Sequence, residues 1–280
     1  MTLSTRRVWL AYGLVALAML VTYSRIDPRR LYDVSGRGFV GGGLSRVVVY
    51  LNFPVALVAI VLGLLAARRS RRLVVGIVSA ALCAVVAVPG VVSQSHLDAR
   101  WVNAVPALGV ALALALELGA RPQLVRVGPF TLAAVTVLGL VSLVWLAAEL
   151  GFHETFGVFL AGQRRPGYPG PVEAAVHLGH HHGLDGAMLV ATALVLRRTA
   201  SSRIGRAYLA LMAAYGLVNC VQDAWTEQVV KRGWTARMIP NALQPRADAV
   251  WGVILALATA AYALDALDRR RAAPPRAVLT

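Results

Sequence analysis

Long apolar stretches alternate with short polar segments along this chain of 280 residues. A helix that crosses a lipid bilayer needs about 20 mostly apolar residues. Apolar runs close to that length fall at eight places, namely residues 8–23, 47–67, 73–92, 102–118, 130–148, 172–196, 207–221 and 249–264. The pattern therefore predicts an all-α fold, a polytopic integral membrane bundle of about eight transmembrane helices.

Three of these runs need interpretation at their ends. In the sixth, only 184–196 is cleanly apolar, so the helix is expected to begin near Pro171, because proline suits a first helical turn. The seventh is expected to extend outward through Trp225. The first run is followed by Ser24-Arg25-Ile26-Asp27, which is a poor cleavage site, so we interpret it as a membrane anchor rather than a signal peptide.

Composition agrees with a membrane protein. Hydrophobic residues make up 58% of the chain and charged residues 15%, against about 25% charged residues in an ordinary soluble domain. A surface that faces lipid needs little charge, which accounts for the difference. We expect a single transmembrane domain over residues 1–268 and a disordered basic cytoplasmic tail over 269–280.

The basic residues are distributed unevenly between the two sides of the predicted bundle. The N-terminal segment, the loops after the second, fourth and sixth runs, and the C-terminal segment carry 16 basic and three acidic residues, while the other side carries 12 basic and ten acidic residues. Basic loops stay in the cytoplasm, so we expect a multi-pass protein of the cell membrane with both termini cytoplasmic. The arginines flank spans without aromatic interleaving, which argues against nucleic-acid binding.

Most of the remaining chemistry lies on the predicted outer side. All six histidines and ten of the thirteen acidic residues fall there. Five of the six tryptophans also lie at or beyond the outer ends of the runs: Trp101, Trp145, Trp225, Trp234 and Trp251. This is typical of an aromatic belt at a membrane surface, and the alternative is that some of them line a site. A chemical site in this protein would therefore open outward.

The densest polar segment precedes and enters the sixth run. Glu173, His177, His181 and Asp185 are spaced by four residues, so on a helix they follow one face. Neutral imidazole is a common metal ligand, and we expect His177 and His181 to bind a metal, with His96 from the segment 93–103 as third ligand. The alternative is a solvated helix end at the membrane surface.

A second polar stripe lies on the seventh run. Asn219, Gln222, Asp223 and Glu227 cluster on one helical face, and polar groups at membrane depth are expected to face the bundle interior. We expect Asp223 and Glu227 to act as acid and base, and Asn219, Gln222 and Trp225 to contact substrate. The alternative is that the two acids cap the helix and pair with Arg232 or Arg237.

Two further loops contribute candidates. Asp98 is the third predicted catalytic residue, and the alternative for it is a simple loop pair with Arg100. In the first outer loop, Arg29 and Arg30 are expected to contact an anionic head group together with Arg232, since arginine binds phosphate and carboxylate well. Plain anchoring at the membrane surface is the alternative for these arginines.

Two partial resemblances accompany these residues. His177-Leu-Gly-His180-His181 resembles the HxxHH box of membrane desaturases and hydroxylases, which use eight or more histidines where this chain has six. The set of His96, His177 and His181 with an aspartate and a serine is similar to the site of membrane zinc hydrolases of the alkaline ceramidase and adiponectin-receptor group. The order of helices and the span count differ from that group, and no family is assigned.

The expected function is a membrane-embedded enzyme with an outward-facing His/Asp/Glu site, a metal-dependent hydrolase or transferase acting on a lipid or isoprenoid-linked substrate. Zinc is the expected metal, because it would activate water or polarise an oxygen. A transporter or channel for a small solute is the alternative, but the first, third and fifth runs have almost no polar residue in their middles. A non-catalytic scaffold is the third possibility. Expected partners are membrane lipids and a lipidic or small-molecule substrate.

Overall fold

The computed structural model describes residues 2–26, 35–93, 96–152, 175–176, 182–243 and 247–272. Helices dominate these residues, and two strands of three residues each form a small sheet. In chain order the elements are β1 (Thr2–Ser4), α1 (Thr5–Tyr23), η2 (Gly38–Leu44), α2 (Ser45–Tyr50), η3 (Leu51–Val55), α3 (Ala56–Arg69), α4 (Leu73–Ala84), η4 (Val85–Ala87), η5 (Trp101–Asn103), α5 (Ala104–Gly119), β2 (Leu124–Arg126), α6 (Pro129–Val141), α7 (Leu143–Glu149), α8 (His182–Leu196), α9 (Arg203–Trp225), η7 (Thr226–Val230) and α10 (Ala249–Ala272).

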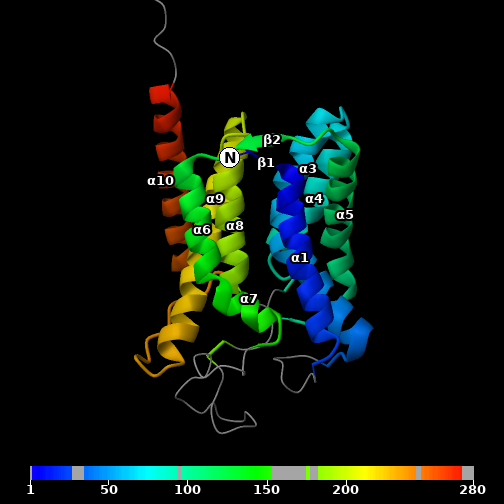
Figure 1. The fold of residues 1–280 in the computed structure, drawn as a ribbon, viewed down its shortest axis with the longest axis vertical. Coiled ribbons are helices and arrows are strands. Elements are labelled where there is room, and N and C mark those ends of the chain that lie inside the picture. The colour runs from blue at the N-terminus through cyan, green and yellow to red at the C-terminus, as the bar shows by residue number, and fades with distance from the viewer. Residues whose placement is uncertain are drawn as a thin grey trace, which may run out of the picture.

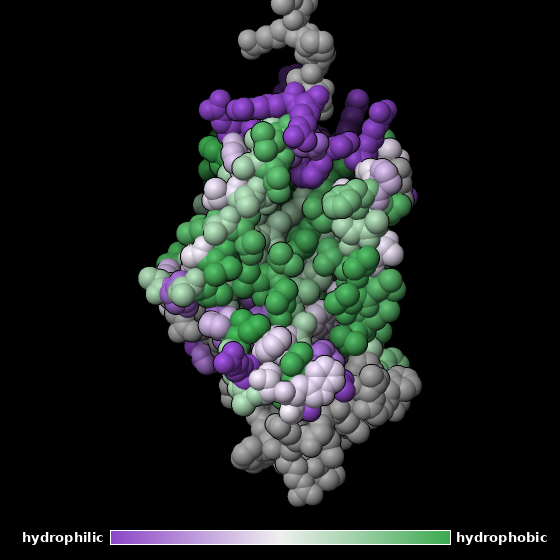
Figure 2. Space-filling view, turned by 90° about the vertical axis from the view of Figure 1, so that its left-hand side faces the viewer, coloured by the Kyte–Doolittle hydropathy of each residue, from purple (hydrophilic) through white to green (hydrophobic). Residues whose placement is uncertain are grey.

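Consecutive elements join into helical segments that follow the predicted apolar runs. Within the described residues, five of them are long and apolar enough to cross a membrane: Thr5–Tyr23, Gly38–Arg69, Trp101–Gly119, Arg203–Val230 and Ala249–Arg271. The pair α6 and α7, bent by 50°, makes a sixth if it counts as one span, and α8 and Leu73–Ala87 are shorter apolar helices. Figure 2 shows apolar side chains gathered in a broad middle zone below a hydrophilic cap.

The basic segments meet at one end of the bundle. β1 pairs with β2 in antiparallel register, with Leu3 opposite Val125, and this joins the N-terminal segment to the loop before α6. The N terminus, this sheet and the last turns of α10 lie at the same end in Figure 1. We call it the basic end, comprising residues 2–7, 68–72, 119–128, 197–206 and 265–272. The predicted grouping of the arginine-rich segments is therefore present in the fold.

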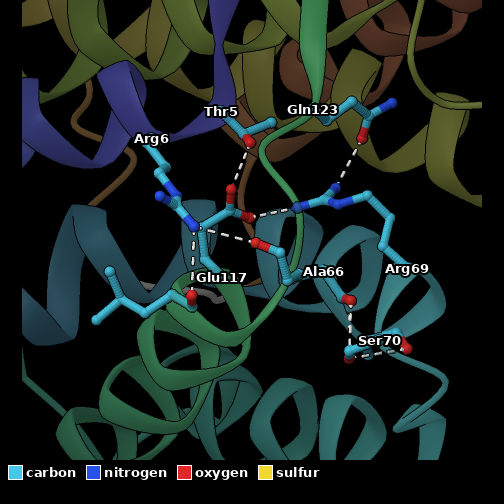
Figure 3. A network of polar contacts seen from close by, with 10 residues as sticks. Thr5, Arg6, Ala66, Arg69, Ser70, Glu117 and Gln123 are labelled. Atoms are coloured by element: carbon cyan, nitrogen blue, oxygen red, sulfur yellow. Dashed lines mark hydrogen bonds and ion pairs between the residues drawn. The ribbon is translucent and has the colours of Figure 1, made fainter.

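A buried carboxylate ties the basic end together (Figure 3). Glu117 on α5 is fully buried, and it accepts hydrogen bonds from Thr5 Oγ1 at 2.5 Å and from Arg69 Nη2 at 2.6 Å. Arg69 Nη1 also donates to Gln123 Oε1 at 2.7 Å, and Arg6 donates to the carbonyl oxygen of Ala120. These contacts link α1, α3 and α5 to the loop before β2, which closes this end of the bundle.

The second helical segment begins earlier than predicted. It starts at Gly38 rather than at residue 47, so the glycines of the first outer loop are helical. A Cβ on Gly42 would lie 2.3 Å from the Tyr23 carbonyl oxygen, and one on Gly43 would lie 2.7 Å from that of Leu20. Glycine at these positions lets the segment pack directly on α1. As a result Arg46 lies within the helix, at 3% exposure.

The C-terminal helix extends past the predicted boundary at residue 268. Arg269 Nε donates to Asp265 Oδ2 at 2.9 Å, one helical turn earlier, and Arg269 Nη2 donates to the Arg197 carbonyl oxygen at the end of α8. These bonds extend α10 to Ala272. Residues 273–280 lie outside the described residues, so their predicted disorder stays a prediction.

Two groups of helices make up the bundle. α3, α4 and α5 pack on one another, and α8, α9 and α10 form the other group, with α6 lying on α8. α1 contacts α7, and η3 contacts α8, so these elements bridge the two groups. The side chains described next come from both groups and from α1.

Candidate functional site

Glycines set the spacing between α8 and α9. A Cβ on Gly186 would lie 2.3 Å from the Gly216 carbonyl oxygen and 2.8 Å from the Cys220 nitrogen. A Cβ on Gly183 would lie 2.2 Å from an indole carbon of Trp145 on α7. Small residues allow helix backbones to approach closely, so α7, α8 and α9 converge at the end opposite the basic end.

This convergence buries four carboxylates, which we call the carboxylate cluster: Glu149, Asp185, Asp223 and Glu227. Each is 6% exposed or less. The Gly183 backbone N–H donates to Asp223 Oδ2 at 2.7 Å. Asp223 interacts electrostatically with Glu227 and Asp185, and Asp185 does so with Glu149, so the four groups form one connected set.

Two aromatic side chains hold the ends of the cluster. Trp145 Nε1 donates to Glu227 Oε2 at 2.6 Å, and the Tyr23 hydroxyl donates to Glu149 Oε2 at 2.8 Å. Trp145 is fully buried, which contradicts a place in a belt at the membrane surface and leaves the alternative that it lines a site. Its indole N–H instead satisfies a buried acid, because buried tryptophan needs an acceptor.

Arg46 on α2 is the only cation among the buried side chains of the described residues. Its guanidinium carbon lies 5.9 Å from the centre of the Tyr23 ring, and Nη2 lies 3.7 Å from Asp98 Oδ1. Its side-chain nitrogens make no hydrogen bond to any residue that the structure describes. Lys231 is a second cation, which interacts electrostatically with Asp223. Four buried carboxylates and these two cations leave the described part of the cluster with an excess of acidic groups.

Arg46 links Asp98 to the carboxylate cluster, because it interacts with both Asp98 and Glu149. Asp98 accepts from the Ser35 backbone N–H and hydroxyl, each at 2.8 Å. Burial raises the pKa of Asp98, but the bonds from Ser35 and Gly36 and the charge of Arg46 outweigh it, so the pKa lies below its ordinary value. An ionised Asp98 that positions Arg46 replaces the alternative of a loop pair with Arg100, whose backbone N–H donates to Asn103.

The predicted stripe on α9 faces inward. Asn219, Gln222 and Asp223 are all buried, as their helical spacing predicted. Asn219 Nδ2 donates to the Tyr215 carbonyl oxygen at 2.9 Å, while its Oδ1 accepts no hydrogen bond from the part of the chain that the structure describes. Gln222 Nε2 donates to Thr226 Oγ1 at 3.1 Å. Asn219 therefore offers a buried acceptor one turn below Asp223.

The other predicted contacts lie elsewhere. Trp225 Nε1 donates to the Arg237 carbonyl oxygen at 2.7 Å, and Arg232 donates to Gln228 Oε1 at 3.0 Å. Both side chains are half-buried and engage the polypeptide after α9. Arg29 and Arg30 lie outside the described residues, so the head-group site they were predicted to form stays a prediction.

The predicted metal site is split between described and undescribed residues. His96 lines a cavity of about 560 Å³, and among the described residues its walls come from the segment 90–103, including Arg100 and Trp101. His177 and His181 lie outside the described residues. Within the described part of the chain, no group of three His, Cys, Asp or Glu side chains is placed to hold a metal ion.

Hydroxyl groups continue from the cluster toward the middle of the bundle. The Tyr12 and Thr192 hydroxyls are 3.2 Å apart, and the Tyr50 hydroxyl donates to Met188 Sδ at 3.8 Å. Both tyrosines interact electrostatically with Asp185, which lies two helical turns from Thr192. The interior midway along α1 is therefore more polar than the apolar run suggested.

An apolar cavity of about 290 Å³ lies beside α9. Phe53, Leu57, Val86, Tyr215 and Trp251 are among the residues that line it, from η3, α3, η4, α9 and α10. Tyr215 is one helical turn from Asn219, on the same face of α9 as Asp223. The cavity therefore adjoins the polar stripe that leads to the cluster.

Sequence reasoning missed Tyr23, Arg46, Trp145 and Glu149. Arg46 and Glu149 stand directly beside apolar runs, where a charge usually marks the membrane surface. The glycines at 41–43 were the available sign that the second segment packs on α1 along its early part.

No protein-family model, curated protein or solved structure matches the chain. Its chemistry is therefore inferred from the side chains themselves. Neighbouring carboxyl groups in a closed interior can give and take a proton or bind a cation.

Proposed function

We propose that the chain is an eight-span membrane protein with both termini in the cytoplasm, and an enzyme whose reaction site is the carboxylate cluster. The apolar middle zone in Figure 2 and the gathering of basic segments at one end support this orientation. The cluster then lies toward the outer side of the membrane. Ionisable residues inside a membrane bundle are costly and usually functional.

The cluster carries this proposal because its buried acids interact electrostatically with one another and outnumber the cations beside them. Asp223 and Glu227 lie one helical turn apart and come from the same helical segment. Such a pair can act as proton donor and proton acceptor. Trp145 and Gly183 each hold one of the two carboxylates in place, which supports a fixed geometry at a reacting bond.

A lipidic substrate is favoured by the apolar cavity beside α9. A chain of methylene or isoprenoid groups would occupy the space between Phe53, Tyr215 and Trp251. The polar end of the same molecule would then extend along α9 past Asn219 toward Asp223. The basic end is closed by the Glu117 contacts, so the substrate would enter laterally or from the outer side.

The experiment is a search for lipid products. The purified chain in nanodiscs would be incubated with a total lipid extract, and lipid masses compared before and after by mass spectrometry. We expect product masses with the wild type that are absent with Asp223→Asn and retained with Asp248→Asn, a matched change at the start of α10. No change of any lipid by the wild type would contradict lipid-directed catalysis.

A zinc ion at His177 and His181 is a separate part of the proposal. Two imidazoles four residues apart on a helix reach a single ion. Elemental analysis of the purified chain should find zinc that His177→Ala and His181→Ala lose and His182→Ala retains. A zinc-free wild type that is active would refute this part and leave the carboxylate cluster as the reaction site.

A proton-linked transporter is the second candidate, favoured by the hydroxyls of Tyr12, Tyr50 and Thr192 below Asp185. Such groups can relay protons between acids. Proteoliposomes with an internal pH dye would show a flux that Asp185→Asn and Tyr12→Phe reduce. If vesicles with the wild-type protein hold their pH gradient and the same protein converts lipid, transport would be excluded in favour of the enzyme.

A further inference from the structure

Another cavity lies at the basic end, between α8, α9 and α10. Its volume is about 410 Å³, and alanines from all three helices face it: Ala193, Ala210, Ala213 and Ala261. Because alanine leaves the space that a longer side chain would fill, the helices are separated there by an apolar groove. α10 buries little of its own surface, so the groove borders the apolar zone of the bundle.

Charged side chains surround the mouth of this groove. Arg197 Nη2 lies 2.8 Å from Asp268 Oδ2, and Arg206 Nη1 lies 3.6 Å from Asp265 Oδ2. All four side chains line the cavity. The apolar floor of the groove therefore meets charged side chains at its mouth. A phospholipid has the same arrangement, because its apolar acyl chains join a charged phosphate.

Arg206 keeps donor capacity at this mouth. Its guanidinium lies over the Tyr262 ring, 5.5 Å from the ring centre, which fixes its position. Its Nε is buried and donates to no acceptor in the described part of the chain, and its contact with Asp265 is long, at 3.6 Å. Asp265 instead accepts a shorter bond, 2.9 Å, from Arg269. The carboxylates at the mouth therefore use little of the donor capacity of Arg206.

The net charge at the mouth favours an anion. Two carboxylates, Asp265 and Asp268, face three guanidinium groups, those of Arg197, Arg206 and Arg269. Further arginines follow these positions in the sequence, at Arg198, Arg270 and Arg271. The side carrying α6 and α10 faces the viewer in Figure 2, with its hydrophilic cap directly above apolar surface.

We propose that this groove binds one anionic phospholipid, with an acyl chain along the alanine-lined floor and the phosphate against Arg206 and Arg197. Basic pockets between membrane helices bind anionic head groups, and guanidinium groups pair well with phosphate. The bound lipid would join α10 to α8 and α9. This proposal requires the apolar zone to lie in a bilayer and is independent of the reaction at the carboxylate cluster.

The test measures which lipid stays with the protein. The full chain would be purified in detergent with equal amounts of phosphatidylglycerol and phosphatidylcholine, and native mass spectrometry would count the retained molecules. We expect the wild type to retain phosphatidylglycerol preferentially. Arg206→Gln should weaken retention about fivefold, the effect of one basic residue at a membrane surface. Arg203→Gln, an exposed arginine three residues away, should have little effect.

A second variant tests the apolar floor. Ala213→Leu fills the groove without changing charge and should also release the lipid, and Ala210→Val is a smaller change for the same purpose. Equal retention of phosphatidylcholine would overturn the proposal, because the charge of the lipid would then play no part. An equal loss in Arg203→Gln would also overturn it, because general surface charge rather than the groove would then explain binding. The proposal would also be overturned if inorganic phosphate stabilised the protein as much as the lipid does. A lipid-free dimer in which a second copy covers α10 would overturn it too.

Discussion

The Trp145 indole N–H donates to the Glu227 carboxylate at 2.6 Å, joining α7 to the end of the α9 segment across 82 residues of sequence. Both side chains are fully buried. The bond fixes one end of the carboxylate cluster, and the close contact of Gly183 with the same indole ring fixes α8 beside it. One aromatic residue thus positions two of the three helices that carry the acids.

Removal of this bond should be costly. Trp145→Phe leaves a buried carboxylate oxygen without its donor, and we expect a loss of about 1–3 kcal/mol in the free energy of unfolding. Thermal unfolding of the detergent-solubilised protein measures it. Trp101→Phe, at a side chain 87% exposed, is the control and should leave the stability unchanged. If both changes had equal effects on stability, the hydrogen bond between Trp145 and Glu227 would have no special structural role.

The spacing of α8 and α9 should depend on glycine. Gly186→Ala places a methyl group 2.3 Å from a backbone oxygen of α9, and overpacking of this kind costs about 1–3 kcal/mol. Gly252→Ala on α10 meets nothing within 4 Å and should be neutral or slightly stabilising, because alanine favours helix. A tolerated Gly186→Ala would mean that the two helices are further apart than described.

The fold was largely predictable because lipid imposes simple rules on sequence. Apolar runs of about 20 residues mark helices, and the uneven distribution of arginine groups the loops by side. The start of the second segment was not predictable, because glycine occurs both in turns and where two helices pack closely. Only contact with α1 shows that Gly42 and Gly43 belong to a helix.

The candidate site was predictable only in part. Asn219, Gln222 and Asp223 were found because a helix converts their spacing into one face. Glu149 and Arg46 were missed because residues beside an apolar run carry no information about which neighbouring helix they face. Helix adjacency depends on side-chain fit between distant segments, which the pattern of one sequence does not show.

The basic end should depend on the Arg69–Glu117 pair. Glu117 is fully buried, and Arg69 is one-fifth exposed. Removal of one partner of a buried pair costs about 3–5 kcal/mol, and we expect the lower end of this range for Arg69→Gln because of that exposure. Arg68→Gln, the exposed neighbour, is the control. The thermal unfolding midpoint should fall for the first variant and stay unchanged for the second.

The proposed orientation is tested by cysteine labelling. The native Cys83 and Cys220 are both buried, so single exposed cysteines give a clear signal. A membrane-impermeant maleimide applied to intact cells should label Ala236→Cys, in the polypeptide after α9, and should label Ser201→Cys at the basic end only after the cells are opened. The reverse pattern would contradict both the orientation and an outward-facing site.

The central claim is that the carboxylate cluster serves function rather than stability, and the most direct test compares thermal unfolding of Asp223→Asn and Glu117→Gln. Asparagine still accepts the Gly183 N–H. It removes a charge that two carboxylates, Glu227 and Asp185, disfavour and one cation, Lys231, favours. We therefore predict an unfolding midpoint at or above that of the wild type for Asp223→Asn, as is common for residues kept for function. Glu117→Gln should lower it, because its ion pair with Arg69 is lost. An equal fall in both variants would contradict the account and make the cluster a structural network like the one at the basic end.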